Sequence, residues 1–131
     1  MMNHVMPLPN ATTLEEYVVT RLLGQGGFGT TYLCVDRNLD RRCVIKEYSP
    51  HHLAERRKNG ELKAKAQRFQ AAFEKGLKGF LDEARTLARF NHPNIVRINR
   101  YFRANGTGYF VMDYESGISL RSLLSQEGSQ L

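Results

Sequence analysis

Apolar and β-branched residues form three short runs in the first part of the chain, at 17–23, 30–35 and 41–48. Each run ends at glycines or at polar residues that are typical of turns. Runs of this length and composition predict β-strands. Because the connections between them are short, we expect three consecutive strands in an antiparallel meander.

The pattern changes to a helical period between Phe69 and Ala88. Apolar or small residues recur there at steps of three and four, which predicts one face of an amphipathic helix. The segment 91–94 ends this pattern, because Pro93 disfavours helical geometry in the residue before it. The predicted face contains Phe69, Ala72, Phe73, Gly76, Leu77, Phe80, Ala84, Leu87 and Ala88.

Two more apolar runs follow the predicted helix, at 95–102 and 107–114, and Asn105-Gly106 between them is a strong hairpin signal. Residues 118–124 then begin a second, shorter helical pattern. The predicted fold class is therefore α+β, with a five-stranded antiparallel sheet, one major helix and the start of another helix.

Three segments fall outside this periodic pattern. Residues 1–16 carry two prolines and no period, so we expect a leader that lies over the surface. Residues 49–65 are polar and basic, with a turn signal at Asn59-Gly60, and form an insertion within the predicted domain 17–124. Residues 125–131 are a tail.

The 131 residues are enough for one domain with a modest core, and the composition is that of an ordinary globular protein. The net charge of +6 raises the hypothesis of nucleic-acid binding, but most basic residues are spread along the chain, so we expect no nucleic-acid partner. One basic cluster is interpreted as a solvated face, with a patch for an acidic partner as the alternative. It contains Arg56, Arg57, Lys58, Lys63 and Lys65.

Cys34 and Cys43 lie within two of the predicted strands and lack the close spacing of metal ligands. We expect both to be small buried residues in a reducing compartment. The chain has no apolar stretch near the ~20 residues that span a bilayer, and no secretory pattern at its start. These features favour a cytoplasmic protein with no membrane segment in this chain.

The segment 24–29 matches G-x-G-x-x-G, a pattern shared by two unrelated kinds of nucleotide site. In a dinucleotide-binding fold the glycines open a helix, whereas here the β-branched run 30–35 follows them. We therefore expect a glycine hairpin between two strands, able to cover phosphates with its backbone N–H groups. A plain glycine-rich turn is the alternative. The loop residues are Gly24, Gln25, Gly26, Gly27, Phe28 and Gly29.

The third predicted strand contains Cys43-Val44-Ile45-Lys46, and its lysine follows Gly29 by 17 residues. Protein kinases carry V-A-I-K at this place, after the same kind of glycine hairpin. Over 17–124 the chain resembles the N-terminal, ATP-binding lobe of a bacterial-type (eukaryotic-like) Ser/Thr protein kinase. The resemblance implies that Lys46 holds the α- and β-phosphates of ATP, since a cation there neutralises charge that is otherwise buried in a cleft.

The resemblance also implies that Glu83, on the predicted helix, pairs with Lys46 and fixes its position. Asp82 points about 100° away from Glu83 around the helix, and Glu83 lies nearer to the apolar face. Asp82 and Glu74 fit better as surface carboxylates that pair with neighbouring basic residues. Glu83 is therefore the preferred partner.

The last predicted strand resembles the strand that enters the kinase hinge. The resemblance implies that Met112 is the gatekeeper at the back of the adenine pocket, and that the backbone of Asp113 and Glu115 binds the adenine edge. Thr31 and Val44 stand where kinases carry the Val and Ala that cover the adenine. One position therefore gains a hydroxyl group, and the other gains bulk.

Part of the chemistry of a kinase is missing from this chain. The catalytic aspartate and the Mg²⁺ ligands of kinases belong to the motifs H-R-D-x-x-x-x-N and D-F-G, and neither occurs in the sequence. We therefore expect no metal ligand here, a kinase C-lobe as partner in the parent protein, an unidentified protein substrate, and no kinase activity from this chain alone.

A stand-alone kinase-like binding module without catalysis is the alternative. Leu87 and Ile98 match the N-lobe half of the hydrophobic spine that runs between kinase lobes. The other half is missing, so we expect exposed apolar surface, which favours a binding partner or a homodimer.

Overall fold

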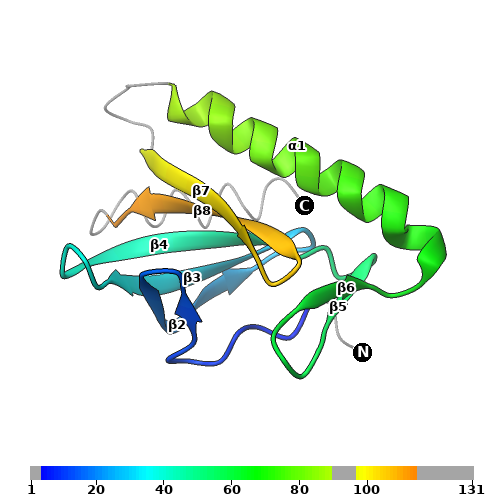
Figure 1. Ribbon diagram of the computed structural model, residues 1–131, viewed down its shortest axis with the longest axis horizontal. Coiled ribbons are helices and arrows are strands. Elements are labelled where there is room, and N and C mark those ends of the chain that lie inside the picture. Colours follow the sequence, from blue (N-terminus) through cyan, green and yellow to red (C-terminus); the bar gives the residue numbers. More distant parts are fainter. Residues whose placement is uncertain (1–3, 90–96, 115–131) are drawn as a thin grey trace.

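The computed structural model describes residues 4–89 and 97–114. A six-stranded antiparallel sheet, in the order β1-β2-β3-β4-β8-β7, forms the body of the molecule (Figure 1). The predicted fold class is confirmed, but the main sheet has six strands rather than five, because β1 from the predicted leader pairs with β2. The strands are β1 (Thr13–Leu14), β2 (Tyr17–Gln25), β3 (Gly29–Asp36), β4 (Arg41–Tyr48), β7 (Ile98–Ala104) and β8 (Thr107–Asp113).

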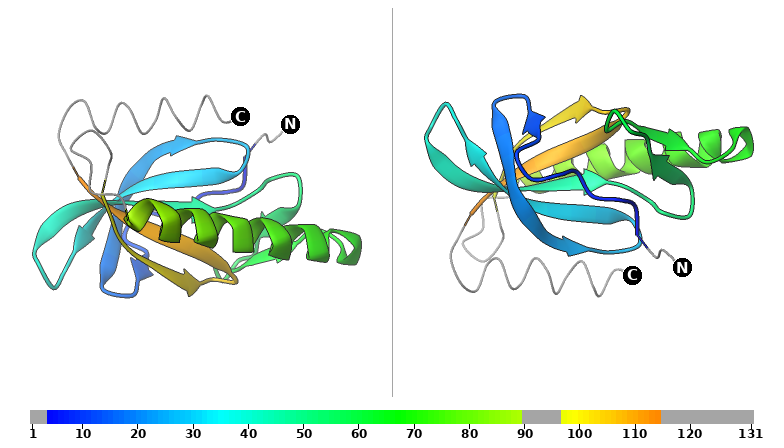
Figure 2. Two further views of the ribbon diagram at one scale, coloured as in Figure 1. Left: turned by 90° about the horizontal axis from the view of Figure 1, so that it is seen from above. Right: turned by 90° about the horizontal axis from the view of Figure 1, so that it is seen from below.

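Helix α1 (Gln70–Ala88), which follows a short 3-10 turn (Gln67–Phe69), packs against one face of the sheet at β7 and β8 (Figures 1 and 2). The three- and four-residue steps of the sequence predict this helix, because residues at that spacing share one side of it. Leu81 is buried although the predicted face leaves it out, and Ala72 is exposed although the face includes it. The buried side chains of α1 are Phe73, Leu77, Leu81 and Ala84.

The sheet has a packed core on both faces, because successive residues of a strand point to opposite sides. We call the face against α1 the inner face and the opposite one the outer face. Buried residues of the inner-face core are Val44, Ala84, Ile98, Phe110 and Met112. Buried residues of the outer-face core are Leu8, Leu14, Tyr17, Val19, Tyr32, Cys34, Cys43, Ile45, Phe102, Tyr109 and Val111. The predicted burial of both cysteines is confirmed.

The sheet curls until its last strand, β7, approaches the start of β2. Arg100 on β7 donates a hydrogen bond to Glu16, which lies between β1 and β2. Next to this ion pair, the Tyr17 ring stacks on the Phe102 ring with their centres 6.0 Å apart. These contacts join β7 to β2, although the two strands lie four places apart in the sheet order.

The predicted leader and the insertion both pack against the sheet. Val5 and Leu8 are buried, and the Leu8 N–H donates to the Tyr32 hydroxyl over 3.0 Å. Figure 1 shows the leader running on the side of the sheet opposite α1. The insertion forms a second, two-stranded sheet from β5 (Ala54–Arg56) and β6 (Leu62–Ala64). Among the described residues of the leader, Val5 and Leu8 are therefore buried rather than lying over the surface as predicted.

Some sequence predictions fall outside the described residues. They are the helix stop at 91–94, the second helix at 118–124, the tail 125–131 and the hinge residue Glu115. In the described ranges, no helix has the length and apolar character needed to cross a membrane.

Candidate functional site

The glycine segment forms the hairpin between β2 and β3, with Gln25 as the last residue of β2 and Gly29 as the first residue of β3. The Gly26 N–H donates to the Gly29 carbonyl over 2.8 Å and closes the turn. An extra residue, Leu23, bulges β2 just before the loop, and such a bulge increases the local twist. Because a strand follows the glycines, the predicted hairpin is confirmed and the dinucleotide-binding arrangement is excluded.

Lys46 lies on β4 directly opposite Thr31 of β3 and Phe110 of β8. Residues that face each other across antiparallel strands point to the same side, so these three share the inner face. Two residues earlier on β4, Val44 lies opposite Met112 on that same face. Four predicted site residues, Lys46, Thr31, Val44 and Met112, are thus brought together on the face that continues into the glycine hairpin.

The structure does not join Lys46 to Glu83. Lys46 is half-buried, with its Nζ atom 6.0 Å from the centre of the Phe110 ring, whereas Glu83 is exposed on α1. Within 4–89 and 97–114 the ion pairs are Glu47–Arg56, Asp82–Arg85 and Glu16–Arg100. The surface pairing expected for Asp82 is confirmed, and Lys46 has no carboxylate partner among the described residues.

Met112 is buried in the inner-face core, opposite Val44 on one side and Ile98 on the other. Its role as gatekeeper of an adenine pocket stays a prediction. Ile98 is itself buried, and Leu87 is half-buried against the same core. The two residues predicted for the spine therefore do not provide the exposed apolar surface that the sequence led us to expect.

Asp113 ends β8. Its backbone contacts Arg97, the residue just before β7, and its side chain contacts Asn99 on β7. Its N–H donates to the Arg97 carbonyl over 3.2 Å, and its carboxylate accepts a hydrogen bond from Asn99. These contacts fix the start of the predicted hinge. The predicted contribution of Glu115 lies outside the described residues.

A buried polar network lies directly behind Lys46 on the outer face. Glu47, the next residue of β4, is completely buried. Its carboxylate accepts two hydrogen bonds from the Arg56 guanidinium, at 2.6 and 2.9 Å. It accepts two more from the hydroxyls of Tyr32 and Tyr109, at 3.0 and 2.6 Å. A carboxylate with four donors, two of them from a bidentate arginine, is strongly held.

Arg56 connects three parts of the chain through this network. It lies on β5 with a side chain only 6% exposed, and it also donates to the carbonyls of Met6 and Gly60, at 2.9 and 3.0 Å. Burial alone lowers the pKa of Arg56, but its hydrogen bonds and attraction to Glu47 outweigh burial, so the pKa is raised. Arg56 therefore stays charged and ties the leader and the insertion to β4.

The sequence interpretation placed Arg56 in a solvated basic cluster, which is wrong for this residue. The signal that was missed is the strand phase of Glu47, which shares one side of β4 with Cys43 and Ile45. Charged residues are almost never fully buried unless they are paired. A glutamate at a core position therefore requires a nearby cation.

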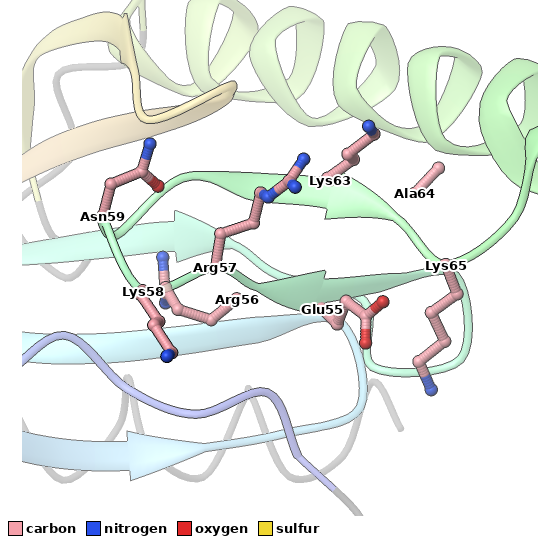
Figure 3. Close-up of a pocket in the computed structure, with 8 residues that line it drawn as sticks. All are labelled: Glu55, Arg56, Arg57, Lys58, Asn59, Lys63, Ala64 and Lys65. Atoms are coloured by element: carbon pink, nitrogen blue, oxygen red, sulfur yellow. The ribbon is translucent and has the colours of Figure 1, made fainter.

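The other basic residues of the cluster surround an open hollow of about 760 Å³ at the β5–β6 hairpin. Figure 3 shows their side chains spreading in different directions from the hairpin, with Glu55 among them. Arg57, Lys58, Lys63 and Lys65 are exposed, which agrees with a solvated face.

A curled antiparallel sheet, one helix against its inner face, a glycine hairpin and a strand lysine together define the small lobe of a kinase fold. A family model described as "Protein kinase domain" matches residues 17–130. The chain belongs to the protein kinase family.

Two bacterial proteins and one solved structure are similar to this chain. The serine/threonine-protein kinase PknD of Mycobacterium tuberculosis is 34% identical over 112 residues, which cover 86% of this chain and 14% of PknD. The probable serine/threonine-protein kinase YbdM of Bacillus subtilis is 29% identical over 119 residues, which cover 90% of this chain and 40% of YbdM. A solved structure titled "PpkA-294 apo form" is 37% identical with a TM-score of 0.83, and the match covers 92% of this chain and 43% of that one. The chain thus spans less than half the length of these relatives.

Proposed function

We propose that this chain is the ATP-binding lobe of a Ser/Thr protein kinase whose full-length parent transfers the γ-phosphate of ATP to protein Ser or Thr. The observation that carries the proposal is the register of β3, β4 and β8, which places Lys46 and Thr31 side by side on the inner face. The serine/threonine-protein kinases among the relatives support the choice of acceptor.

The inner face offers groups that match a nucleotide. The hairpin supplies backbone N–H groups from a glycine-rich turn, and Lys46 supplies a cation that no described carboxylate neutralises. Thr31, Val44 and Met112 lie on the same face, where they would border the adenine. The backbone of Asp113 and Glu115 would bind the adenine edge, as in the sequence prediction.

Mg-ATP, when bound, supplies the phosphoryl group for transfer and a divalent charge that offsets the phosphates. In the described part of the chain, no group of three or more His, Cys, Asp or Glu residues is arranged to hold a metal ion. The Mg²⁺ ligands and the catalytic aspartate would come from the C-lobe of the parent protein. This chain by itself should therefore transfer no phosphate.

Glu83 would act in a second arrangement of α1. In the described arrangement it is exposed, while Phe80 and Leu87 are half-buried against the inner-face core. A rotation of α1 about its axis would turn Glu83 towards Lys46. Lys46 would then be fixed for the phosphates, and the pair would report the active state of the parent kinase.

Titration of the 131-residue chain with Mg-ATP by calorimetry tests the proposal. Lys46→Met is compared with Lys63→Met, which removes an exposed lysine of the β5–β6 hairpin and the same charge. We expect weak binding by the wild type and by Lys63→Met, and at least about tenfold weaker binding by Lys46→Met, because a hydrogen bond to a charged group contributes about 1.5–3 kcal/mol. Equal affinities of all three proteins would contradict the proposal.

A cytoplasmic location is also part of the proposal. Cys34 and Cys43 lie directly opposite each other on β3 and β4, and both are free thiols. Reduced neighbouring thiols fit a reducing compartment. Burial raises the pKa of both thiols, that of Cys43 to about 12, so neither forms the reactive thiolate at neutral pH.

A further inference from the structure

Residues 49–52, which directly follow β4, form hydrogen bonds with the glycine hairpin, and we call them the back turn. The Ser49 N–H donates to the Phe28 carbonyl over 2.9 Å, and the His51 N–H donates to the Gly27 carbonyl over 3.3 Å. The Nδ1 atom of His51 lies 3.2 Å from the same Gly27 oxygen, which can only accept, so Nδ1 carries the proton. Two consecutive loop carbonyls are therefore fixed by one short segment.

Two side-chain contacts reinforce this attachment. The rings of His52 and Phe28 meet edge to face, with their centres 5.2 Å apart. Phe28 is 52% exposed at the loop. The His52 ring packs against one side of it. The Ser49 and Thr30 hydroxyls lie 2.7 Å apart and are both buried. The back turn thus contacts the loop and the first residues of β3.

The geometry of the peptide bond determines where the N–H groups next to these carbonyls point. In a planar trans peptide the N–H points opposite to the C=O of the residue before it. The Gly27 and Phe28 carbonyls point to the back turn, so the N–H groups of Phe28 and Gly29 point away from it. Backbone N–H groups that point the same way in a glycine-rich turn form an anion-binding surface.

We propose that His51 and His52 are positioning residues of the glycine loop. They hold the Gly27 carbonyl and the Phe28 ring, and thereby aim the Phe28 and Gly29 N–H groups at the phosphates of ATP. Neither histidine touches the nucleotide itself. The proposal rests on the proposed ATP-binding function, and it gives a role to the first part of the insertion.

Three variants of the 131-residue chain separate the contacts. His51→Phe keeps a ring but removes the Nδ1 donor, whereas His51→Asn keeps an amide N–H at about the same place. His52→Ala removes the ring that packs on Phe28. Dissociation constants are measured for Mg-ATP and, separately, for adenosine, which has no phosphates.

We expect His51→Phe and His52→Ala to weaken Mg-ATP binding about tenfold. This is the effect of losing one hydrogen bond from a loop N–H group to a charged phosphate. Adenosine binding should not change, and His51→Asn should stay close to the wild type. If Lys46→Met weakens ATP binding but the histidine variants do not, or if they weaken adenosine equally, the positioning role is wrong while the ATP-binding function stands. If Lys46→Met also has no effect, the ATP-binding function fails.

Hydrogen exchange of the Ser49 and His51 amides gives a second readout that needs no nucleotide. Both amides donate to loop carbonyls, so they should exchange slowly in the wild type and faster in Phe28→Ala and His52→Ala. Fast exchange in the wild type, or unchanged exchange in both variants, would overturn the proposal even where ATP binding is too weak to measure.

Discussion

Lys46 and Glu47 are neighbours on β4, but they lie in opposite environments. Glu47 is fully buried on the outer face and accepts four hydrogen bonds, two of them from Arg56. Lys46 is half-buried on the inner face and has no carboxylate partner among the described residues. Because successive strand residues point to opposite faces, one strand carries a completed ion pair on one side and an unpaired cation on the other.

Under the proposed function, the outer face of β4 serves stability and the inner face serves nucleotide binding. On the outer face, the leader and the β5–β6 hairpin meet at Arg56 and anchor β4. On the inner face, the lysine on that anchored strand forms no ion pair with a described carboxylate, as the proposed nucleotide site requires. A binding group is most effective when its supporting strand cannot move, because a misplaced group loses its geometry for the ligand.

Breaking the outer-face ion pair should have the largest effect. Arg56→Met leaves the Glu47 carboxylate buried without its cation, so we expect the free energy of unfolding to fall by about 3–5 kcal/mol. Urea denaturation measures this change. The double variant Glu47→Gln with Arg56→Met leaves no buried charge and should lose less than the single variant. A single variant as stable as the wild type would show that the pair is not buried as described.

Alkaline pH should lower the stability of the fold through Cys43, which is buried in the outer-face core. The unfolded Cys43 thiol ionises near pH 9, whereas burial raises the pKa of the folded thiol to about 12. The raised pKa gives stability that is complete below pH 9 and is lost as the pH rises towards 12, because only the unfolded thiol ionises in that interval. Between pH 8.5 and 10.5 we expect Cys43 to contribute about 2 kcal/mol of this loss.

Denaturation curves of the wild type and of Cys43→Ala at both pH values isolate this contribution. The variant should lose less stability than the wild type over the interval, whatever its stability at pH 8.5. The same dependence on pH in both proteins would show that Cys43 is not buried as a neutral thiol.

Two glycines of α1 give a matched pair of smaller effects. A Cβ on Gly76 would lie 2.0 Å from the Tyr48 hydroxyl, which donates to the Phe73 carbonyl, whereas a Cβ on Gly79 meets nothing within 4 Å. We expect Gly76→Ala to destabilise the protein by about 1–3 kcal/mol and Gly79→Ala to stabilise it by up to ~1 kcal/mol. Thermal unfolding distinguishes the signs, and two stabilised variants would contradict the packing of α1 on Tyr48.

Changing Lys46 should have the smallest effect on stability. Lys46→Met removes a charge that forms no ion pair with the described residues, so we expect the free energy of unfolding to change by no more than about 0.5 kcal/mol. Urea denaturation of Lys46→Met and Arg56→Met under the same conditions compares their losses of stability directly. A loss above about 2 kcal/mol, on the scale expected for a buried pair, would show that Lys46 is structural.

The sequence predicts the elements whose pattern repeats. The run 41–48 matches β4 at both ends, and the helical period ends at Ala88, as α1 does. β1, β5 and β6 are two or three residues long, which is too short for alternation to be recognised, and they were missed. The buried partner of Glu47 was missed because it lies in a polar segment, nine residues further along the chain.

Part of the candidate site follows from strand alternation in the same way. Lys46, Val44 and Thr31 share a face because their strands are in register, and the sequence predicts that hairpin and strand order. The side on which Glu83 lies depends on the rotation of α1. That rotation follows from tertiary packing, including the burial of Leu81, which the repeat alone does not reveal.

Labelling with a lysine-reactive acyl-phosphate derivative of ATP tests the central claim most directly, because the derivative modifies a lysine beside the bound phosphates. Mass spectrometry of the labelled chain, with and without excess ATP, locates the site. We predict modification of Lys46, suppressed by ATP, with little labelling of exposed Lys63 and Lys65. Labelling that falls mainly on those exposed lysines and is not suppressed by ATP would contradict a nucleotide site on the inner face.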